Sequence, residues 1–412
     1  MVKKFFWITL LVCFWFTSAL VCYTPAAQAF TEEQKLLLQS WRIVNQSYLD
    51  ETFNHQNWWL TRQKFVKKPL RDREETYTAI EEMLAGLDDP FTRLLRPEQY
   101  RSLQVNTSGE LSGVGLQINL EPKTKLVEVI SPLAGSPAEA AGIEPKDLIL
   151  EIDGVSTKTL TLDEAAMKMR GSIGTKVDLR IQSPEKDNQI RTVNLVRDRI
   201  TLNPVYARLD TQGDKPIGYV RLNQFSANAA KEIAHSVSKL EQEGAEAYIL
   251  DLRNNPGGLL QAGVEIARMW LDNGTIVYTV NRQGTLGSFE SNHEILTEDP
   301  LIVLVNQGTA SASEILAGAL QDNGRALLVG EKTFGKGLIQ SLFELPDGAG
   351  LAVTVAKYET PSHKDINKLG IMPDRTVTQE PIAFAQIGSE ADLQYQEAFR
   401  LLTNESIIAE AS

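Results

Sequence analysis

The spacing of hydrophobic residues divides the chain into stretches with different predicted secondary structure. Over residues 30–104, apolar residues recur at helical spacing. Thr31 followed by Gln34 is typical of a capping box at a helix start, and a second helix is predicted over Glu74–Leu87. We therefore expect a helical N-terminal region over 30–104.

Residues 105–197 change to short apolar runs separated by turns, which predicts strands with two short helices. The strands are expected near 115–118, 126–130, 148–152, 177–181 and 192–196, and the helices near 136–142 and 162–169. This arrangement resembles a PDZ domain over its whole length. One departure is Lys146, where many PDZ domains carry glycine, and we expect it to be tolerated on the surface.

A glycine-rich turn, Gly113-Val114-Gly115-Leu116, opens the first strand of that segment. Glycines there leave successive backbone N–H groups unobstructed, which makes a nest able to hold a carboxylate. The adjoining strand edge can pair with an extended peptide. The free C-terminus of a polypeptide has a carboxylate that can enter the nest and an extended backbone that can pair with the strand edge. These four residues are therefore the candidate peptide carboxylate-binding site.

From residue 198 to 412, strands alternate with helices, which favours an α/β layer architecture ending in a helical tail. The predicted strands are 217–222, 247–252, 276–280, 301–305 and 338–343, and the helices are 229–243, 259–271 and 313–321. The predicted class is therefore α/β, or α+β when the several domains are taken together.

The first 29 residues are expected to be a signal peptide. Lys3 and Lys4 precede an apolar run over 5–22, and small residues at Ala27 and Ala29 offer a cut before Phe30. An uncleaved membrane anchor is the alternative. Cleavage would give an exported chain.

Composition narrows the class of function. The 412 residues carry 41 Lys and Arg against 53 Asp and Glu, a net charge of −12, which argues against a nucleic-acid partner. Cys13 and Cys22 both lie in the first 29 residues, so the mature chain would have no disulfide and no cysteine nucleophile or metal ligand.

Ser311 lies where a buried strand turns into a helix, beside exposed N–H groups and the positive end of a helix dipole. That position suits a nucleophile, although serine is also an ordinary helix cap. A serine nucleophile needs a base. The histidines His55, His235, His293 and His363 leave a Ser-His arrangement open, but none lies in a glycine-marked turn.

Lys336, between Gly335 and Gly337, is the other candidate base. A lysine acts as a base near neutral pH only if its pKa, about 10.4, falls by about 3 units through burial. Gln340 lies four residues further along a predicted extended stretch and could orient the amine without adding charge. A P-loop interpretation of Gly330–Lys336 fails because Gly337 replaces the required Ser or Thr.

Gly257 and Gly258 follow the predicted strand 247–252 and can present N–H groups to an oxyanion. Taken together, segments 251–258, 308–314 and 335–340 behind a PDZ domain resemble the carboxyl-terminal processing proteases, which use a Ser-Lys dyad. The resemblance implies a crotonase/ClpP-like core. It also implies Ser311 as nucleophile, Lys336 as general base, Gln340 as its orienting partner, and Gly258 with the Ala312 amide as oxyanion hole. Whether Gly257 or Gly258 donates stays open.

Within that family the chain is most similar to the cyanobacterial and chloroplast members. The resemblance implies removal of a C-terminal extension from the precursor of a photosystem II reaction-centre polypeptide. It further implies a thylakoid-lumen or periplasmic location near the membrane surface, a monomer, and no metal or cofactor. The alternatives are a general periplasmic tail-specific protease, a non-catalytic PDZ adaptor and a Ser-His esterase.

Overall fold

The computed structural model describes residues 30–403 apart from 122–123, 134, 212–214 and 383–385. The predicted signal peptide and both cysteines lie outside these residues. The chain divides into two compact units, one built from residues up to Leu94 together with Leu342–Val353, and the other from Leu95–Ser341 together with the chain from Thr354 onward. Within the described residues, no helix has the length and apolar character needed to span a bilayer.

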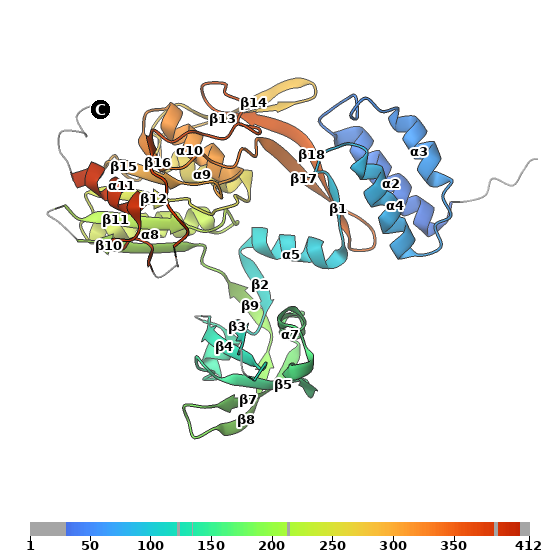
Figure 1. The fold of residues 1–412 in the computed structure, drawn as a ribbon, viewed down its shortest axis with the longest axis horizontal. Helices are drawn as coiled ribbons and strands as arrows, with labels where there is room; N and C mark the ends of the chain where they lie inside the picture. The colour runs from blue at the N-terminus through green and yellow to red at the C-terminus, as the bar shows by residue number, and fades with distance from the viewer. Residues whose placement is uncertain (1–29, 122–123, 134, 212–214, 383–385, 404–412) are drawn as a thin grey trace, which may run out of the picture. The chain divides into compact units, whose positions relative to one another are not determined.

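Among its described residues, the first unit contains the helices α2 (Glu32–Ser47), α3 (Trp58–Val66) and α4 (Arg73–Ala85) (Figure 1). The predicted capping box is confirmed, because the N–H of Gln34 donates to Thr31 Oγ1 at 3.1 Å and the Gln34 side chain accepts from the Thr31 N–H. Trp41 Nε1 donates to the carbonyl of Trp58 at 2.9 Å and ties α2 to α3. The sequence did not single out α3 as a separate helix.

A distant stretch of chain completes this unit. Tyr77, on α4, donates its hydroxyl to Asp347 Oδ2 at 2.7 Å, and Arg73 lies 3.4 Å from the same carboxylate. Asp347 is at the turn between β17 (Leu338–Glu344) and β18 (Gly350–Glu359). These two strands therefore begin in one unit and end in the other.

The second unit contains the predicted PDZ domain. Its antiparallel strands follow the order β3-β4-β5-β7-β8, with bounds Leu116–Leu120, Val127–Pro132, Leu148–Ile152, Lys176–Ser183 and Gln189–Val196. Helices α6 (Pro137–Ala140) and α7 (Leu162–Met169) cover its core. The preceding helix, α5 (Pro97–Ser108), runs past the predicted boundary at residue 104.

Strand β2 (Glu110–Gly113) leads into this domain and pairs with β9 (Asp198–Thr201), which leads out of it. Lys146 is exposed with φ of 69°, a left-handed conformation that glycine adopts most easily. Its ammonium contacts Glu185 at 2.7 Å. The predicted surface position of this lysine is confirmed, and its left-handed backbone conformation accounts for the glycine expected there.

The predicted α/β core is a six-stranded sheet with strand order β10-β11-β12-β15-β16-β19, in which β10 is antiparallel and the strands from β11 to β19 are parallel. The strands span Val205–Asp210, Ile217–Leu222, Ala247–Asp251, Leu301–Val305, Ala326–Gly330 and Arg375–Thr376. The helices are α8 (Ala229–Gln242), α9 (Leu260–Arg268), α10 (Ala312–Asp322) and α11 (Leu393–Thr403).

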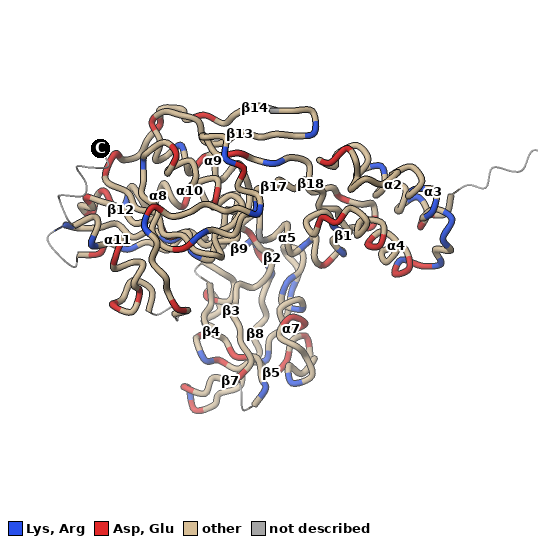
Figure 2. Tube along the Cα trace, turned by 45° about the horizontal axis from the view of Figure 1, so that its top comes forward, with Lys and Arg blue, Asp and Glu red and all other residues tan. Residues whose placement is uncertain are grey.

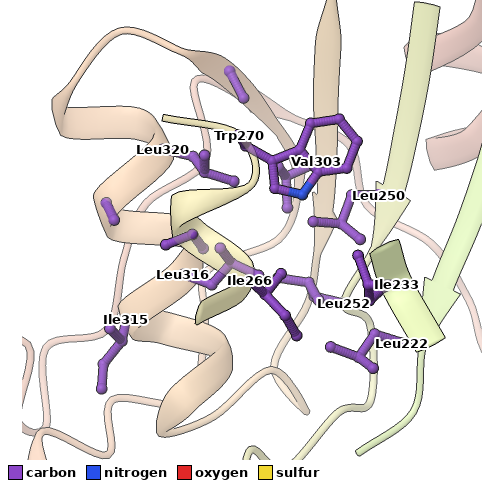
Figure 3. Packing of buried hydrophobic residues seen from close by; sticks show 14 of the residues in the cluster. Leu222, Ile233, Leu250, Leu252, Ile266, Trp270, Val303, Ile315, Leu316 and Leu320 are labelled. Carbon is purple, nitrogen blue, oxygen red and sulfur yellow. The ribbon is translucent and has the colours of Figure 1, made fainter. Parts of the chain in front are cut away.

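Alternate residues of the central strands face the two sides of this sheet. On β12, Tyr248 and Leu250 pack with α8, α9 and α10, whereas Ala247 and Ile249 pack with α11. Figure 3 shows the first side, where Trp270 lies beside Leu250 and the helix residues around it. The predicted strand 276–280 is β13 (Thr275–Asn281), which instead pairs antiparallel with β14 (Gly284–Glu290) and with the 356–359 end of β18.

The three segments that contain the candidate catalytic residues each follow one of three neighbouring parallel strands. Residues 252–258 follow β12, residues 306–311 follow β15, and residues 331–337 follow β16. Since the carboxyl ends of parallel strands meet at one edge of a sheet, the topology gathers these segments there.

A buried ion network fixes α11 to this edge. Arg253 is held between Asp251, at 2.7 Å, and Asp392, at 2.7 and 2.8 Å, and both carboxylates are fully buried. Burial alone would raise the pKa of Asp251, but Arg253 and Arg221 hold it below its ordinary value. Asp392 also accepts from the N–H of Tyr395 and so caps α11.

We expect Asp392→Ala to lower the free energy of unfolding by about 3 kcal/mol, because it removes one partner from a buried ion network. Asp392→Asn, which keeps the helix cap, should cost less. The measurement is urea unfolding at pH 7. Asp365→Ala, which breaks an exposed pair with Lys357, is the matched control and should cost under about 1 kcal/mol. An equal effect of the two alanine variants would contradict the assignment.

Candidate active site

Ser311 is the N-cap residue of α10 and has a strained backbone conformation. Its φ of 58° and ψ of −119° lie in a region that non-glycine residues rarely adopt and that costs about 1–3 kcal/mol. Such strain persists only where the surroundings hold the residue in place. Backbone bonds do so here: the N–H of Ala310 donates to the Asn255 carbonyl at 3.0 Å, and that of Phe334 donates to the Thr309 carbonyl at 3.0 Å.

One buried carboxylate joins this turn to the lysine segment. Glu314, fully buried, accepts from the N–H groups of Ser311 (2.9 Å), Gly335 (2.7 Å) and Lys336 (2.8 Å), and from the Thr333 hydroxyl (2.6 Å). The N–H groups of Ser311 and Lys336 share the same oxygen, Oε2. Their backbone nitrogens are therefore separated by no more than two hydrogen-bond lengths.

Tyr358, on β18, makes a second link between the same two residues. Its hydroxyl donates to the carbonyl of Ser311 at 3.1 Å and also to the carbonyl of Lys336. The phenol is buried, and burial together with the nearby Glu314 carboxylate raises its pKa well above the ordinary value. The hydroxyl therefore stays protonated and able to donate.

Lys336 is half-buried between two glycines that permit close packing, as the sequence indicated. A Cβ atom on Gly335 would lie 3.0 Å from the N atom of Gly370, and one on Gly337 would lie 2.6 Å from the N atom of Asn367. The 366–370 turn therefore lies directly against this segment.

Gln340 lies on β17 and donates its amide to Thr354 Oγ1 at 3.4 Å. Because β17 begins at Leu338, the two-residue period that was expected to align Gln340 with Lys336 does not extend back to the lysine. A role for Gln340 in orienting the amine stays a prediction.

The double glycine lies against the serine turn. A Cβ atom on Gly257 would lie 2.6 Å from the Ala310 carbonyl oxygen and 2.8 Å from Ser311 Cβ. The N–H of Gly257 donates to Asn255 Oδ1 at 2.9 Å, whereas no acceptor among the described residues contacts the N–H of Gly258. This difference favours Gly258 as the oxyanion donor.

Ala312 is the first residue of α10, and its N–H makes no hydrogen bond within the described chain. First-turn N–H groups have no partner inside a helix and carry the positive end of its dipole. The arrangement can therefore offer two donors, from Gly258 and Ala312, to a developing negative charge.

Asparagine side chains fasten the 252–258 loop to the 306–311 loop. The N–H of Asn254 donates to Asn306 Oδ1 at 2.9 Å, and Asn306 Nδ2 donates back to Asn254 Oδ1 at 3.0 Å. Asn306 Oδ1 also accepts from the N–H of Gly308 at 3.0 Å. Nothing in the spacing of these residues indicated the pair.

The predicted carboxylate-binding turn lies between β2 and β3. Gly115 has φ of 76°, and Gly115 and Val114 use their carbonyls to accept from Leu133 and Ala138. In the described chain, neither residue's N–H donates to a protein acceptor outside the strand ladders. Strand β3 is at the edge of its sheet, with half-buried Leu116 beside the apolar core.

All four histidines are exposed. The His293 ring contacts Asp272, and the His363 ring contacts Glu359 and stacks on the Tyr278 ring. None of the hydrogen bonds of the described residues joins a histidine to Ser311. Sequence reasoning missed Glu314 and Tyr358. The spacing Ser311-x-x-Glu314 is a capping-box signal that could have identified the first, and no comparable signal marks the second.

A PDZ domain, together with an α/β core that carries a strained serine, a lysine and the two N–H groups of Gly258 and Ala312, is typical of a serine peptidase that handles polypeptide ends. Comparison with known proteins agrees: Peptidase family S41 matches residues 216–377 and the PDZ domain family matches residues 102–182. The chain belongs to the carboxyl-terminal processing proteases of peptidase family S41, which are serine-type hydrolases.

The similar proteins share most of their length with this chain. A carboxyl-terminal-processing protease of Picosynechococcus is 68% identical, covering 94% of this chain and 93% of the relative. Carboxyl-terminal-processing peptidase 2, chloroplastic, of Arabidopsis thaliana is 47% identical, covering 85% and 70%. A solved photosystem II D1 C-terminal processing protease is 40% identical with a TM-score of 0.57, covering 89% of this chain and all of that one.

We expect Gly257→Ala to reduce kcat by at least about 100-fold, because the added Cβ would displace the Ser311 turn from the oxyanion donors. Peptide hydrolysis under single-turnover conditions measures the effect. Gly244→Ala is the matched control, since Gly244 has nearly the same φ, 91° against 93°, with open space around it. Equal losses in the two variants would show that backbone strain, and not the close approach, is responsible.

Proposed function

We propose that this enzyme removes the C-terminal extension of the photosystem II D1 precursor, acting in the thylakoid lumen or periplasm, as a monomer near the membrane surface. A solved relative bears the name of that activity, and the relatives at 68% and 47% identity are a cyanobacterial and a chloroplastic protein. The observation that carries the catalytic assignment is the shared Glu314 carboxylate, which brings the backbones of Ser311 and Lys336 together.

In the proposed reaction, Lys336 in its amine form takes the proton from Ser311 Oγ as this oxygen bonds to the scissile carbonyl carbon. The N–H groups of Gly258 and Ala312 hold the resulting oxyanion. Lys336 then gives the proton to the leaving amine as the C–N bond breaks. Water, deprotonated by Lys336, attacks the acyl-enzyme, and the proton returns to Ser311 as the new carboxylate leaves. Gln340 orients the amine.

Substrate capture is assigned to the PDZ turn. Backbone N–H groups of Gly113–Leu116 bind the terminal carboxylate, and the edge of β3 pairs with the residues before it. Half-buried Leu116, Ile118 and Leu120 supply apolar surface along that edge, and α7 packs close to β3. These groups bind the backbone and the terminal carboxylate of a peptide, so the substrate that fits them is an unfolded tail with a free C-terminus.

We expect cleavage to fall by at least about 1,000-fold in each of three variants: Ser311→Ala, Lys336→Ala and Lys336→Arg. The alanine variants remove the nucleophile or the base, and the arginine variant fails because arginine does not deprotonate. The assay measures hydrolysis of a peptide with the D1 precursor tail and of an unrelated tail of equal length. Lys332→Ala, which removes an exposed lysine from the same segment, is the control and should be active. More than about a tenth of normal activity in Lys336→Ala would refute the dyad, and equal cleavage of both tails would favour a general tail-specific protease.

Gly115→Ala should raise KM for a tail peptide about tenfold, because a Cβ there meets Ser136 Cβ at 2.2 Å and distorts the carboxylate-binding turn. KM is compared for the free acid and the C-terminal amide, and the variant should lose most of the preference for the acid. Gly154→Ala, at the same φ of 76° but in open space, is the matched control. An unchanged acid preference in Gly115→Ala would place carboxylate binding elsewhere.

A further inference from the structure

A basic segment stands out in this acidic chain. Residues 58–73 contain six Lys and Arg and one carboxylate, Asp72, although the whole protein carries a net charge of −12. Figure 2 shows these cations gathered along α3 and the turn that follows it. The segment lies outside the catalytic machinery.

One face of α3 is exposed along its whole length. Trp59, Leu60, Gln63, Lys64 and Lys67 are all exposed and recur at helical spacing, whereas Trp58 and Phe65 on the opposite side are buried. Trp59 is 54% exposed and Leu60 57% exposed. We call the five exposed residues the α3 basic face. It combines two large apolar side chains at one end with two lysines at the other.

The cations of this segment differ in their partners. Lys68, Arg71 and Arg73 lie within salt-bridge distance of carboxylates, namely Glu82, Glu75, and Glu33 with Asp347. Within the described chain, Lys64 and Lys67 have no carboxylate at that distance. The Lys64 ammonium lies 5.5 Å from the centre of the Phe65 ring, which does not neutralise its charge. The positive charge of both lysines is therefore available to an external anion.

The tryptophan is held in a defined position. The Arg62 guanidinium lies 4.8 Å from the centre of the Trp59 ring and 5.5 Å from that of Trp41, and the two indoles pack edge to face. A tryptophan presented beside cations matches the boundary between lipid headgroups and acyl chains. An acidic protein surface would pair with the lysines but offers no apolar layer for Trp59 and Leu60.

The N-terminal end of the described chain meets the same helix. Gln34 donates its side-chain amide to the Val66 carbonyl at 3.2 Å, so the start of α2 lies beside the end of α3. Phe30, 45% exposed, immediately precedes α2, and the apolar run of residues 5–22 comes before it in the sequence. The residues that follow this apolar run in the sequence therefore lie beside the end of α3.

We propose that the α3 basic face docks the protein on the surface of a bilayer that contains anionic lipid. Lys64 and Lys67 attract the headgroups, and Trp59 and Leu60 enter the interface. This inference is independent of the peptidase mechanism, since neither lysine belongs to the proposed site.

The test is flotation of the chain from Phe30 onward, which contains every described element, with phosphatidylcholine vesicles that contain or lack phosphatidylglycerol. Lys64→Gln/Lys67→Gln should weaken partitioning to the anionic vesicles roughly 10- to 30-fold. Trp59→Ala/Leu60→Ala should weaken it while keeping its salt dependence. High salt should release the unmodified protein to a large extent, because it screens exposed charges.

Two matched variants serve as controls. Lys158→Gln/Lys231→Gln removes two other exposed lysines, and Ile190→Ala/Val196→Ala removes two other exposed apolar residues. Both should partition as the unmodified protein does. Lys64→Gln/Lys67→Gln should also cleave a soluble tail peptide at the normal rate, which separates loss of docking from loss of catalysis.

Three results would overturn the proposal. One is equal partitioning of the two lysine variants, and another is equal partitioning to vesicles with and without phosphatidylglycerol. The third is binding to polyglutamate without binding to vesicles, which would assign the face to an acidic polypeptide.

Discussion

The arrangement of the Ser311 turn and the Lys336 segment depends on one carboxylate that is buried away from water. Glu314 is fully buried, and an ionised carboxylate in that position is tolerated only when its oxygens are hydrogen-bonded. Four donors satisfy it, and they come from the serine turn and from the lysine segment. Moving either segment would leave the charge unpaired, so the carboxylate holds both in register while their side chains stay available for chemistry.

The strained backbone of Ser311, near this carboxylate, is held in place by hydrogen bonds between the surrounding loops. Ser311 adopts a backbone conformation that few side chains accept, and Gly257 lies so close to it that a larger residue would not fit. The paired amides of Asn254 and Asn306 and the hydroxyl of Tyr358 fasten the neighbouring loops. Because these contacts lie within the protein itself, they hold in place the N–H groups of Gly258 and Ala312 that are proposed as oxyanion donors.

The sequence predicted β11, β12 and β15 of the core sheet and helices α8, α9 and α10, because each has a local signature of alternation or helical spacing. It did not predict β10, β16 or β19. It located Ser311, Lys336 and the double glycine, since their neighbours along the chain are distinctive. It did not reveal Tyr358 or the Asn254 and Asn306 pair, because those contacts join strands and loops far apart in sequence. The role of Gln340 in orienting the Lys336 amine stays a prediction, because the strand that carries Gln340 begins at Leu338, after the lysine.

The first unit is assembled from two stretches of chain, and this has a consequence for biosynthesis. Tyr77 and Arg73 contact Asp347, which leaves the ribosome some 270 residues after Tyr77. Translation therefore delivers the whole PDZ domain and the nucleophile segment before the N-terminal helices can complete their packing. Until then their partner surface is open to chaperones and proteases, so a nascent chain that stalls before residue 347 would be exposed to degradation at its own N-terminal end.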